Sequence, residues 1–378
     1  MRLFQGEKAM LKAGKLMISS AEKNSDMRYA SGVSTPDDIL WFSCDAISGL
    51  VASPLEFDRI KEERSSDVAV FSESEFGGPK YIDMVKNIAL RYRLDGFEVP
   101  CDFPLLLADQ LREAGLMIEP VEKSFFPERE FKKSNEVNKI ILALRAAEKG
   151  CERAISVLQE SDVDNQKRLI WQGNILTSEI LRSEIDCTIL RAGCLPTGTI
   201  CAGGVQGSQP HNQGSGVLYA DTPIVMDIFP RSATTGYWGD LTRTVVKGKA
   251  SNIVKKAFEA VLEARNLAKN MLAIGAVPAE IHRAAAMSME KRGFFTGCGD
   301  SGNYGFFHGL GHGVGLDIHE NPRLSIRNNE PLKGGEVVTV EPGLYYAEWG
   351  GIRLEDMAYI DYSGKVEILT EIDTFLEI

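Results

Sequence analysis

Three of the five histidines in this chain lie within thirteen residues, in the run HGLGHGVGLDIHE (308–320). Four glycines are interspersed among them. Each glycine in a helix interior costs about 1 kcal/mol relative to alanine, so we expect a loop or extended chain. His308 and His312 have the spacing of a zincin helix, but Gly309 stands where that motif requires glutamate, which excludes it. The imidazoles are candidates for metal ligation, proton transfer or donation to a substrate carbonyl, with a glycine-rich structural turn as the alternative.

Four acidic residues form a second set of candidates, because each comes from a short, strand-like apolar segment. The segments and their acids are 222–227 with Asp227, 237–246 with Asp240, 336–343 with Glu341, and 351–356 with Glu355. Side chains alternate along a strand, so we expect Thr242 on the face of Asp240, and Arg353 on the face of Glu355. An exposed strand end would explain any one of these acids. Four of them, together with a histidine cluster, require a joint explanation.

A metal site would provide that explanation. Buried carboxylates must be paired, protonated or bound to metal. Arg353 and Arg243 are near the acids in the sequence, but they balance only part of the charge. Two divalent cations would neutralise all four carboxylates, so the residues predict a dinuclear centre. Carboxylate ligands with one imidazole and no thiolate favour Mn²⁺, Co²⁺ or Fe²⁺ over Zn²⁺.

The elements that must position these residues follow from hydrophobic periodicity. Helical spacing begins after three candidate caps and one first-turn proline, at Ser134, Thr177, Ser251 and Pro278. His282 lies on the last of these helices, and we interpret it as a structural or surface histidine. Residues 1–125 contain no chemical constellation and predict an α/β segment with strands at 38–44 and 67–72 and helices at 80–93 and 103–115.

Composition limits the classes of function. A chain of 378 residues with 44% hydrophobic and 25% charged residues is typical of a globular protein of two or three domains. Its net charge of −11 disfavours nucleic-acid binding, which needs a basic surface. No apolar run approaches the roughly 18 residues of a membrane span, and the N-terminal residues lack the apolar core of a signal peptide. The seven cysteines are scattered without a CxxC pair, so we expect reduced thiols in a cytoplasmic protein.

The order of the candidate residues resembles that of the pita-bread metallopeptidases, which include methionine aminopeptidase, Xaa-Pro aminopeptidase and prolidase. The matching pieces are Asp227, GDLTRT with Asp240, HGLGH with His312, EPG with Glu341, and GIRLED with Glu355. The likeness begins at about residue 130. The preceding part resembles, more weakly, the N-terminal domain of Xaa-Pro aminopeptidases, prolidases and creatinases, chiefly in DMRYASGV (26–33). The resemblance implies an α+β fold, in which a smaller α/β domain (1–125) precedes a pita-bread catalytic domain (126–378) with a curved antiparallel sheet covered by helices.

The resemblance also implies roles for single residues. Two divalent ions, Mn²⁺ before Co²⁺, Fe²⁺ or Zn²⁺, would be held by Asp227, Asp240, His312, Glu341 and Glu355. Glu341 would also accept a proton, while His308 and His319 would polarise the substrate carbonyl or stabilise the oxyanion. Substrate contacts would come from His211, His308, His319 and Arg353. Two metals about 3.5–4 Å apart can lower the pKa of a shared water from about 15.7 to about 7, so the ions should contribute more than the histidines.

The function implied by the resemblance is metal-dependent hydrolysis of the Xaa-Pro bond at the N-terminus of peptides, as in Xaa-Pro aminopeptidases. An Xaa-Pro dipeptidase (prolidase) and a catalytically silent pita-bread binding module are the alternatives. Creatinase-like hydrolysis without metal is disfavoured by the complete ligand set. The expected partner is a peptide, and the expected protein is a homodimer that binds neither nucleic acid nor a membrane.

Two loops near the candidate residues leave the shape of the substrate pocket open. The family usually has Asp-x-Gly at the first ligand and a shorter gap to the second, whereas Asp227 and Asp240 are thirteen positions apart. We expect an enlarged connecting loop between strand ends that stay in place. The segment 202–216 is glycine-rich but lacks the Gly-Lys-Ser/Thr ending of a phosphate loop, so we interpret it as a flexible pocket edge carrying His211.

Overall fold

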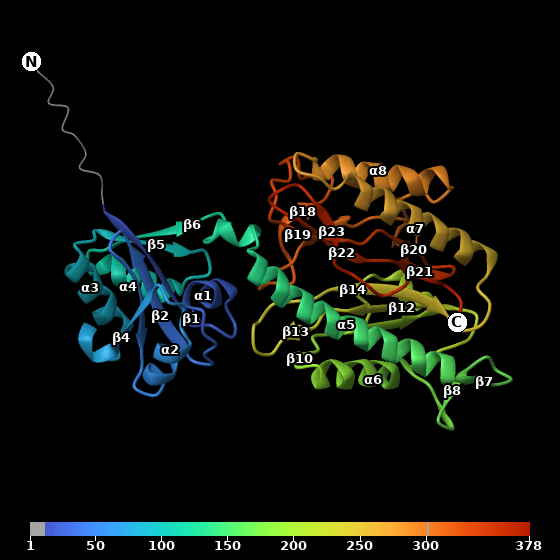
Figure 1. Cartoon of the computed structure of the whole chain (residues 1–378), viewed down its shortest axis with the longest axis horizontal. Coiled ribbons are helices and arrows are strands. Elements are labelled where there is room, and N and C mark those ends of the chain that lie inside the picture. The colour runs from blue at the N-terminus through green and yellow to red at the C-terminus, as the bar shows by residue number, and fades with distance from the viewer. Residues whose placement is uncertain (1–11, 301) are drawn as a thin grey trace, which may run out of the picture. The chain divides into compact units, whose positions relative to one another are not determined.

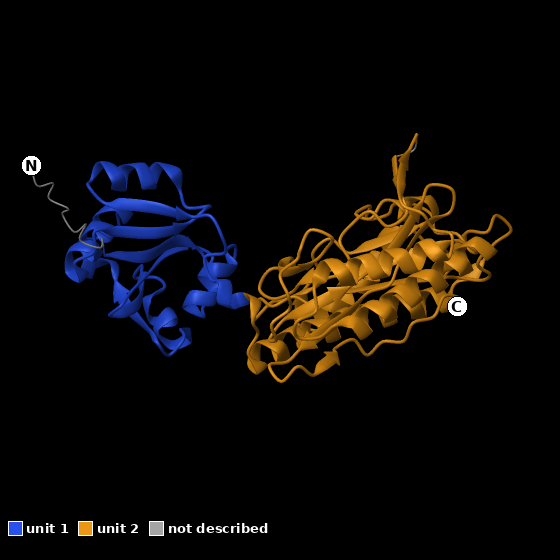
Figure 2. Cartoon of the chain, turned by 90° about the horizontal axis from the view of Figure 1, so that it is seen from above, with its two compact units in different colours: residues 1–129 blue, residues 130–378 orange. Residues whose placement is uncertain are grey.

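The computed structural model describes residues 12–300 and 302–378 of the chain. The chain divides into two compact units, Met1–Arg129 and Glu130–Ile378 (Figure 2). Both units contain helices and sheets, which makes the fold α+β. Across the described residues, no helix combines the length and the apolar composition needed to cross a membrane.

The N-terminal unit is built on one six-stranded sheet in the order β4-β3-β2-β1-β5-β6 (Figure 1). Its strands are β1 (Ala13–Ser20), β2 (Asp38–Cys44), β3 (Ile47–Ala52), β4 (Val68–Ser72), β5 (Gly96–Pro100) and β6 (Met117–Val121). Strands β1 to β3 form an antiparallel meander. Strand β4 pairs in parallel with β3, β5 pairs in parallel with β1, and β6 pairs in parallel with β5. The helices are α1 (Ser25–Ser31), α2 (Phe57–Glu63), α3 (Tyr81–Tyr92) and α4 (Leu105–Glu113). The two strands and two helices predicted from the sequence are confirmed as β2, β4, α3 and α4.

Both faces of this sheet are buried, and successive side chains of a strand enter opposite cores because they alternate between the faces. Leu16 and Phe42 belong to the core that α3 and α4 cover, whereas Met17 and Trp41 belong to a second core on the other face. All the candidate site residues lie in the other unit, so the remaining description concerns that unit.

The C-terminal unit has two helix pairs with the sheets between them, α5 with α6 and α7 with α8 (Figure 1). The helices are α5 (Ser134–Glu160), α6 (Ser178–Arg191), α7 (Asn252–Met271) and α8 (Pro278–Lys291). The predicted caps Thr177 and Ser251 and the first-turn Pro278 are confirmed. Ser134 is not a cap but the first helical residue. Its neighbour Lys133 takes the cap position, because the Glu136 carboxylate accepts the Lys133 N–H.

Two antiparallel sheets carry the candidate residues. The three-stranded sheet, in the order β11-β12-β14, consists of β11 (Ile200–Gly203), β12 (Pro223–Ile228) and β14 (Leu241–Val246). The five-stranded sheet, in the order β18-β17-β19-β22-β23, consists of β17 (Gly311–Gly313), β18 (Glu320–Leu324), β19 (Val337–Val340), β22 (Asp356–Ile360) and β23 (Val366–Ile368). Helix α5 contacts β12 and β14, α7 contacts β19, and α8 contacts β18. Strands β14 and β22 also contact each other, so the two sheets meet beside Asp240 and Glu355.

Short strands and a buried apolar core complete this unit. The short strands are β7 (Asp162–Val163), β8 (Leu169–Trp171), β9 (Asn174–Ile175), β10 (Cys194–Leu195), β13 (Arg231–Ser232), β15 (Gly297–Gly299), β16 (Gly302–Tyr304), β20 (Gly343–Tyr346) and β21 (Gly350–Arg353). Val338, Val340 and Ile360 on the five-stranded sheet pack with Val261 of α7 and Ile281 of α8. Each such side chain stabilises the fold by about 1.5–3 kcal/mol relative to an exposed one, and together they fix the strand ends that bear the acids.

Candidate metal centre

Strand register places the first two acids next to each other. In the antiparallel pair of β12 and β14, Asp227 is opposite Thr242 and Ile228 is opposite Leu241. Asp240 immediately precedes β14, so both aspartates lie at the same end of this strand pair. Asp240 is buried, with a relative exposure of 5%.

The long connection between these aspartates extends the hairpin rather than displacing its strands. Within residues 229–239, Gly239 N donates to Pro230 O over 3.0 Å. Trp238 N donates to Gly315 O over 2.9 Å, which docks the connection on the glycine-rich histidine segment. The expectation that both strand ends stay in place is therefore confirmed.

The five-stranded sheet delivers the other three candidate ligands. His312 lies in the middle of β17, Glu341 directly follows β19, and Glu355 directly precedes β22. Because Val340 of β19 is opposite Asp356 of β22, the two glutamates extend from neighbouring ends of paired strands.

The glycines around His312 have a packing reason. A Cβ at Gly311 would lie 2.0 Å from Thr339 O, and a Cβ at Gly313 would lie 2.1 Å from Asn321 O. Only glycine permits the close approach of β17 to both its neighbours. The glycine-rich segment forms the short strand β17 between loops and no helix, as its glycine content predicts.

Atoms that can ligate a metal meet at the end of these strands. One ligand atom each from Asp240, His312 and Glu355 lies within 4.8 Å of the other two. His312 Nε2 is 3.2 Å from Glu341 Oε1 and 3.6 Å from Asp240 Oδ2. Four of the five predicted ligands therefore surround one small volume.

Thr242 links the fifth predicted ligand to this group. Its hydroxyl oxygen is 3.0 Å from Asp227 Oδ1 and 2.8 Å from Glu355 Oε2. A hydroxyl has one proton, so Thr242 can donate to only one of these carboxylates at a time. Strand alternation predicts that Thr242 lies on this face, but it does not predict that the residue joins two acids.

The orientation of His312 leaves one ring nitrogen for a ligand. Its Nδ1 is 3.1 Å from Gly313 O, and a carbonyl can only accept, so Nδ1 carries the proton. Nε2 then faces Glu341 and Asp240, which is the usual arrangement of a metal-ligating histidine. Burial alone would lower the pKa of His312, but the hydrogen bond to Glu341 and the negative charges of Glu341 and Asp240 raise it.

The acids of this centre differ in the direction of their pKa shifts. Burial and the neighbouring carboxylates, chiefly Asp240, raise the pKa of Glu355 well above its usual value. Burial and Asp227 likewise raise the pKa of Asp240. Burial would also raise the pKa of Glu341, but its hydrogen bond with His312 and the charge of His312 lower it to about 2.

These residues fit a divalent cation site. Glu355 Oε1 is buried and has no hydrogen-bond partner among the residues that the structure describes. A buried polar atom without a partner costs about 1–3 kcal/mol, and a carboxylate held this way is suited to an electropositive ligand. A set of carboxylates with one imidazole is the donor set of a hard or borderline metal ion.

Arg353 pairs with Asp227 in this structure. Its Nη2 donates to Asp227 Oδ2 over 2.6 Å, and its Nε donates to Thr242 Oγ1 over 3.2 Å. Its Nη1 lies 2.9 Å from the Tyr345 hydroxyl and 3.4 Å from Pro210 O. The guanidinium therefore fixes the Asp227 carboxylate and the loop before His211, while its predicted contact with substrate stays a prediction.

Tyr345 connects Arg353 to His308. Burial raises the pKa of Tyr345 to about 12, so its hydroxyl keeps its proton, and this hydroxyl lies 3.0 Å from His308 Nε2. His308 Nδ1 must donate to Gly309 O at 2.7 Å, and burial lowers the pKa of the ring. A neutral His308 therefore accepts from Tyr345 at Nε2, and both its nitrogens are occupied.

Sequence reasoning alone does not single out Tyr345. The available signal is the glycine content of its hairpin, β20 and β21. A Cβ at Gly343 would lie 2.4 Å from the Tyr345 hydroxyl oxygen, and a Cβ at Gly351, the cross-strand partner of Tyr345, would lie 3.1 Å from its ring. Both glycines leave room for the tyrosine ring in the site.

The remaining predicted histidines lie at the edge of the centre. His319 is exposed, and its ring is edge-on to His312 with 4.4 Å between centroids. The buried pair of Lys132 Nζ and Glu320 Oε2, 2.9 Å apart, anchors the segment that carries His319. His211 is exposed on its loop.

His282 is separate from the five predicted ligands. Its ring stacks on Phe306 with 5.0 Å between centroids, and burial lowers its pKa to about 4. This packing agrees with the structural role inferred from the sequence.

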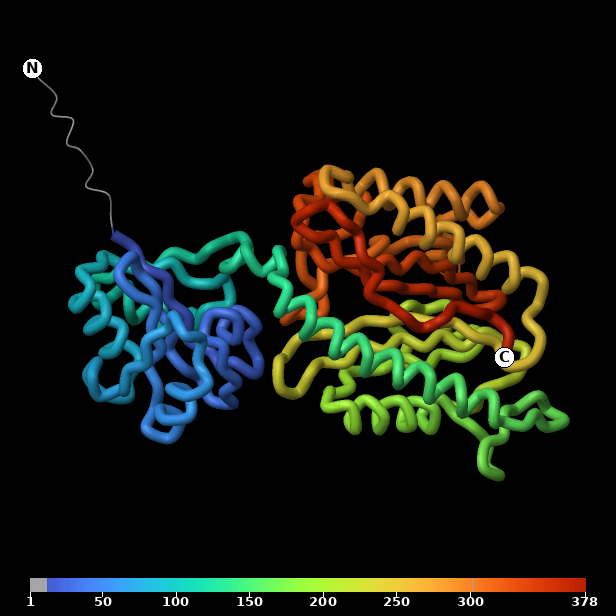
Figure 3. The backbone as a smooth tube through the Cα atoms, in the orientation of Figure 1, coloured from blue at the N-terminus to red at the C-terminus, as the bar shows by residue number. Residues whose placement is uncertain are grey.

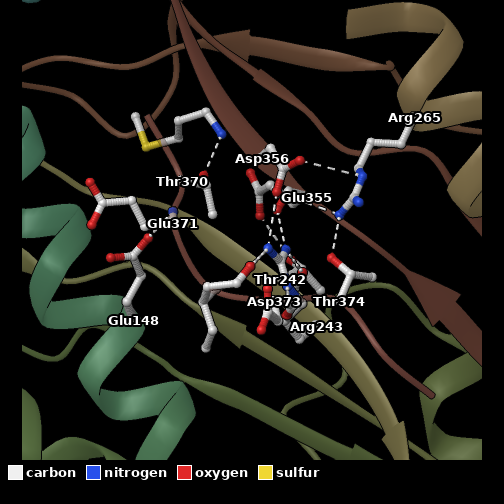
Figure 4. A network of polar contacts seen from close by, with 12 residues as sticks. Glu148, Thr242, Arg243, Arg265, Glu355, Asp356, Thr370, Glu371, Asp373 and Thr374 are labelled. Atoms are coloured by element: carbon white, nitrogen blue, oxygen red, sulfur yellow. Dashed lines mark hydrogen bonds and ion pairs between the residues drawn. The ribbon is translucent and has the colours of Figure 1, made fainter. Parts of the chain in front are cut away.

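Arg243 does not balance the acids in the way its position in the sequence suggests. It follows Thr242 on β14, so its side chain points to the opposite face of the strand. There it lies 3.0 Å from the Asp356 carboxylate, and its side chain is 3% exposed (Figure 4). Arg243 therefore pairs with Asp356 and does not balance the charge of the candidate ligands, contrary to what its position in the sequence suggests.

Comparisons with known proteins agree with this geometry. The model of metallopeptidase family M24 matches residues 138–361, which include all five predicted ligands. The curated Xaa-Pro dipeptidase of Pyrococcus horikoshii is 26% identical over 347 residues, covering 91% of this chain and 90% of that protein. The curated Xaa-Pro dipeptidase of Pyrococcus furiosus is 35% identical over 167 residues, and peptidase YqhT of Bacillus subtilis is 35% identical over 166. The chain spans less than half the length of these last two relatives, 45% and 44% respectively.

Solved structures share the whole fold. The X-Pro aminopeptidase of Thermotoga maritima superposes with a TM-score of 0.81 at 23% identity, covering 97% of this chain and 98% of that chain. The prolidase of Pyrococcus furiosus superposes with a TM-score of 0.78, also at 23% identity, covering 96% and 97% of the two chains. At these identities the likeness shows the fold, which is the two-domain pita-bread architecture expected from the sequence.

Proposed function

The chain belongs to metallopeptidase family M24, and from this premise we propose that it hydrolyses Xaa-Pro peptide bonds with two divalent cations. The observation that carries the proposal is the convergence of Asp240, His312 and Glu355, with Glu341 and Asp227 held beside them. The relatives support the substrate class, since two are Xaa-Pro dipeptidases and one structural neighbour is an X-Pro aminopeptidase.

We propose that the five residues Asp227, Asp240, His312, Glu341 and Glu355 hold the ions, with Mn²⁺ as the first candidate. When bound, such ions supply an activated water and polarise the substrate carbonyl. Burial and the mutual repulsion of the carboxylates raise the pKa of Asp240 and Glu355, and bound cations would compensate that repulsion. Metal analysis of the chain reconstituted with Mn²⁺ tests the expected ratio of about two ions per chain.

Glu341 is the proposed proton acceptor. Its low pKa keeps it ionised at neutral pH, and its carboxylate is shared with His312 and with the Thr339 hydroxyl at 3.3 Å. An ionised carboxylate in the centre can take a proton from the attacking water and return it to the departing proline nitrogen. That nitrogen must receive a proton because an amine leaves far more readily than an amide anion, and in an Xaa-Pro bond it has no hydrogen of its own to donate to the site.

The hydrogen bonds favour His319 over His308 for contact with the substrate carbonyl. Both nitrogens of His308 are engaged by Gly309 and Tyr345, whereas His319 is exposed beside His312. We propose that His319 polarises the carbonyl and that His308, with Tyr345, supports the wall of the pocket. His211 would close the outer edge.

A substrate panel tests this function. The full chain, stripped of metal and reconstituted with Mn²⁺, is assayed on Xaa-Pro dipeptides, longer Xaa-Pro peptides and Met-initiated peptides without proline. We expect turnover of Xaa-Pro substrates only. Preference for longer peptides supports the aminopeptidase mode expected from the sequence, and preference for dipeptides supports the dipeptidase mode that the names of the curated relatives favour.

Two results would contradict the proposal. Cleavage of Met-initiated peptides at a similar rate would remove the proline specificity. Absence of Mn²⁺ binding after reconstitution would favour the alternative of a silent binding module.

A further inference from the structure

Arg243 joins two backbone segments that carry proposed metal ligands. Its Nη1 lies 3.0 Å from Thr242 O on β14 and 2.5 Å from Glu355 O before β22, and it donates to both carbonyls. Thr242 O also accepts Glu355 N–H over 3.1 Å. The guanidinium thus connects the same two residues, Thr242 and Glu355, that this backbone hydrogen bond joins.

The other side of this guanidinium is held by a charged cluster, defined here as Arg243, Arg265, Lys269 and Asp356. Figure 4 shows Arg243 and Arg265 beside Asp356. Arg243 Nη2 lies 3.0 Å from Asp356 Oδ1, Arg265 Nε lies 3.4 Å from Asp356 Oδ2, and Lys269 Nζ lies 2.6 Å from Asp356 Oδ2. One carboxylate therefore receives three cations. Burial would raise the pKa of Asp356, but these cations, led by Arg265, lower it.

The segment 369–378 encloses the cluster from outside. Ile372 O and Asp373 O accept from Arg243 over 2.8 and 3.2 Å, and Thr374 Oγ1 accepts from Arg265 over 3.1 Å. Farther along, Leu376 O accepts from Val246 N at the end of β14, so the segment follows that strand (Figure 3). With these contacts, each of the three guanidinium nitrogens of Arg243 donates to at least one acceptor, which fixes the position of the side chain.

We propose that Arg243 is a positioning residue that fixes the backbone of Thr242 and Glu355 and thereby sets the affinity of the centre for divalent cations. The inference rests on the proposed metal centre. A planar guanidinium with fixed donor directions can bridge two carbonyls and a carboxylate, whereas an ammonium group is a point charge. Partners outside the ligand shell commonly change metal affinity by about 10–100-fold when they are replaced.

Position and charge make opposite predictions for this cluster. If the cluster acted only through its positive charge, removal of any one cation would reduce the repulsion felt by a bound cation and tighten binding. If Arg243 acts by position, its removal loosens Glu355 and weakens binding. Lys269 provides a matched comparison, because its side chain contacts Asp356 in the same cluster, whereas the hydrogen bonds to Thr242 O and Glu355 O come from Arg243.

The test is calorimetric titration of Mn²⁺ into the full, metal-stripped chain, at a temperature where circular dichroism shows each variant folded. We expect Arg243→Met to weaken Mn²⁺ binding by about 10–100-fold. Arg243→Lys keeps the charge and should also weaken binding, by a smaller factor. Lys269→Met should leave the affinity unchanged or increase it. Arg243→Lys keeps the proposal testable if Arg243→Met does not fold.

The outcomes test the metal centre and the positioning role of Arg243 separately. Wild-type affinity in both Arg243 variants, or an equal loss in Lys269→Met, overturns the positioning role while the metal centre stands. A wild-type chain that binds no Mn²⁺ overturns the metal centre, and the positioning role with it. Weakened binding in both Arg243 variants with an unaffected Lys269→Met supports both.

Discussion

Glu355 and Asp356 are neighbours in the sequence, both are buried, and they point to opposite faces of the same strand end. Asp356 is surrounded by Arg243, Arg265 and Lys269, which lower its pKa. The Glu355 carboxylate accepts a hydrogen bond from Thr242 at Oε2, its Oε1 has no partner among the described residues, and its pKa is raised. The difference shows that burial alone does not define the role of an acid. The carboxylate whose partners the chain supplies is structural, and the carboxylate left short of partners is available to a ligand.

The same contrast holds for the two clusters as wholes. The metal centre contains four carboxylates and His312, with Arg353 and three further histidines beside it, so acidic groups outnumber permanent cations. The charged cluster behind β14 contains three cations and one carboxylate, so positive charge is in excess. Charge excess in a buried site is stable only when an outside partner or a close opposite cluster compensates it. A divalent cation satisfies that requirement for the centre, and the backbone carbonyls around Arg243 satisfy part of it for the charged cluster.

The largest effect is expected from a substitution in the metal centre, where carboxylates are in excess. Glu341→Gln removes both a proposed ligand and the proposed proton acceptor, so kcat on an Xaa-Pro substrate should fall by about 10³-fold or more, since the loss of a base alone costs about 10²–10⁴-fold. Turnover is measured at saturating Mn²⁺. The matched control is Glu348→Gln, the same change at an exposed glutamate close to Tyr345 in the chain, and it should retain activity. Activity like that of wild type in Glu341→Gln would remove this residue from the mechanism.

The next effect sharpens the comparison by changing each neighbouring acid in turn. In the metal-free chain, Asp356→Asn leaves three cations without their carboxylate. Breaking a buried ion pair by removal of one partner costs about 3–5 kcal/mol, so the free energy of unfolding should fall by about that amount. Glu355→Gln removes an acid whose raised pKa already disfavours its charge, and the free energy of unfolding should rise by on the order of 1 kcal/mol.

Urea unfolding of both variants in the presence of a chelator measures these changes. Equal destabilisation by the two substitutions would contradict the distinction between the acids. With saturating Mn²⁺, Glu355→Gln should become less stable than wild type, because the wild type then gains binding energy that the variant lacks.

Sequence reasoning predicts more of the strands than of the contacts behind them. Asp227, Asp240, Glu341 and Glu355 are visible because an acid on an apolar strand is unusual, and His312 is visible because histidines are few. The role of Arg243 is not visible, since its partners Ile372 and Asp373 are distant in the sequence and offer backbone carbonyls that any residue type has. The start of α5 shows the same limit. The Glu136 carboxylate accepts the Lys133 N–H, so Lys133 rather than Ser134 is the cap.

The smallest predicted effect is on the pH dependence of the metal-free chain, and here the two acids again act in opposite directions. The pKa of Glu355 is raised in the folded chain from 4.5, so the folded state binds more protons and stability falls as pH rises through the folded pKa. The pKa of Asp356 is lowered from 3.8, so its contribution is present above that value and is lost as pH falls below it. Glu355→Gln should therefore flatten the curve of unfolding free energy against pH above 4.5, and only partly, because Asp240 also has a raised pKa. Urea unfolding of wild type and Glu355→Gln over this range, with chelator present, measures the slopes. Parallel curves would mean that Glu355 is ionised at every pH tested and that the chain, not a cation, already compensates its charge.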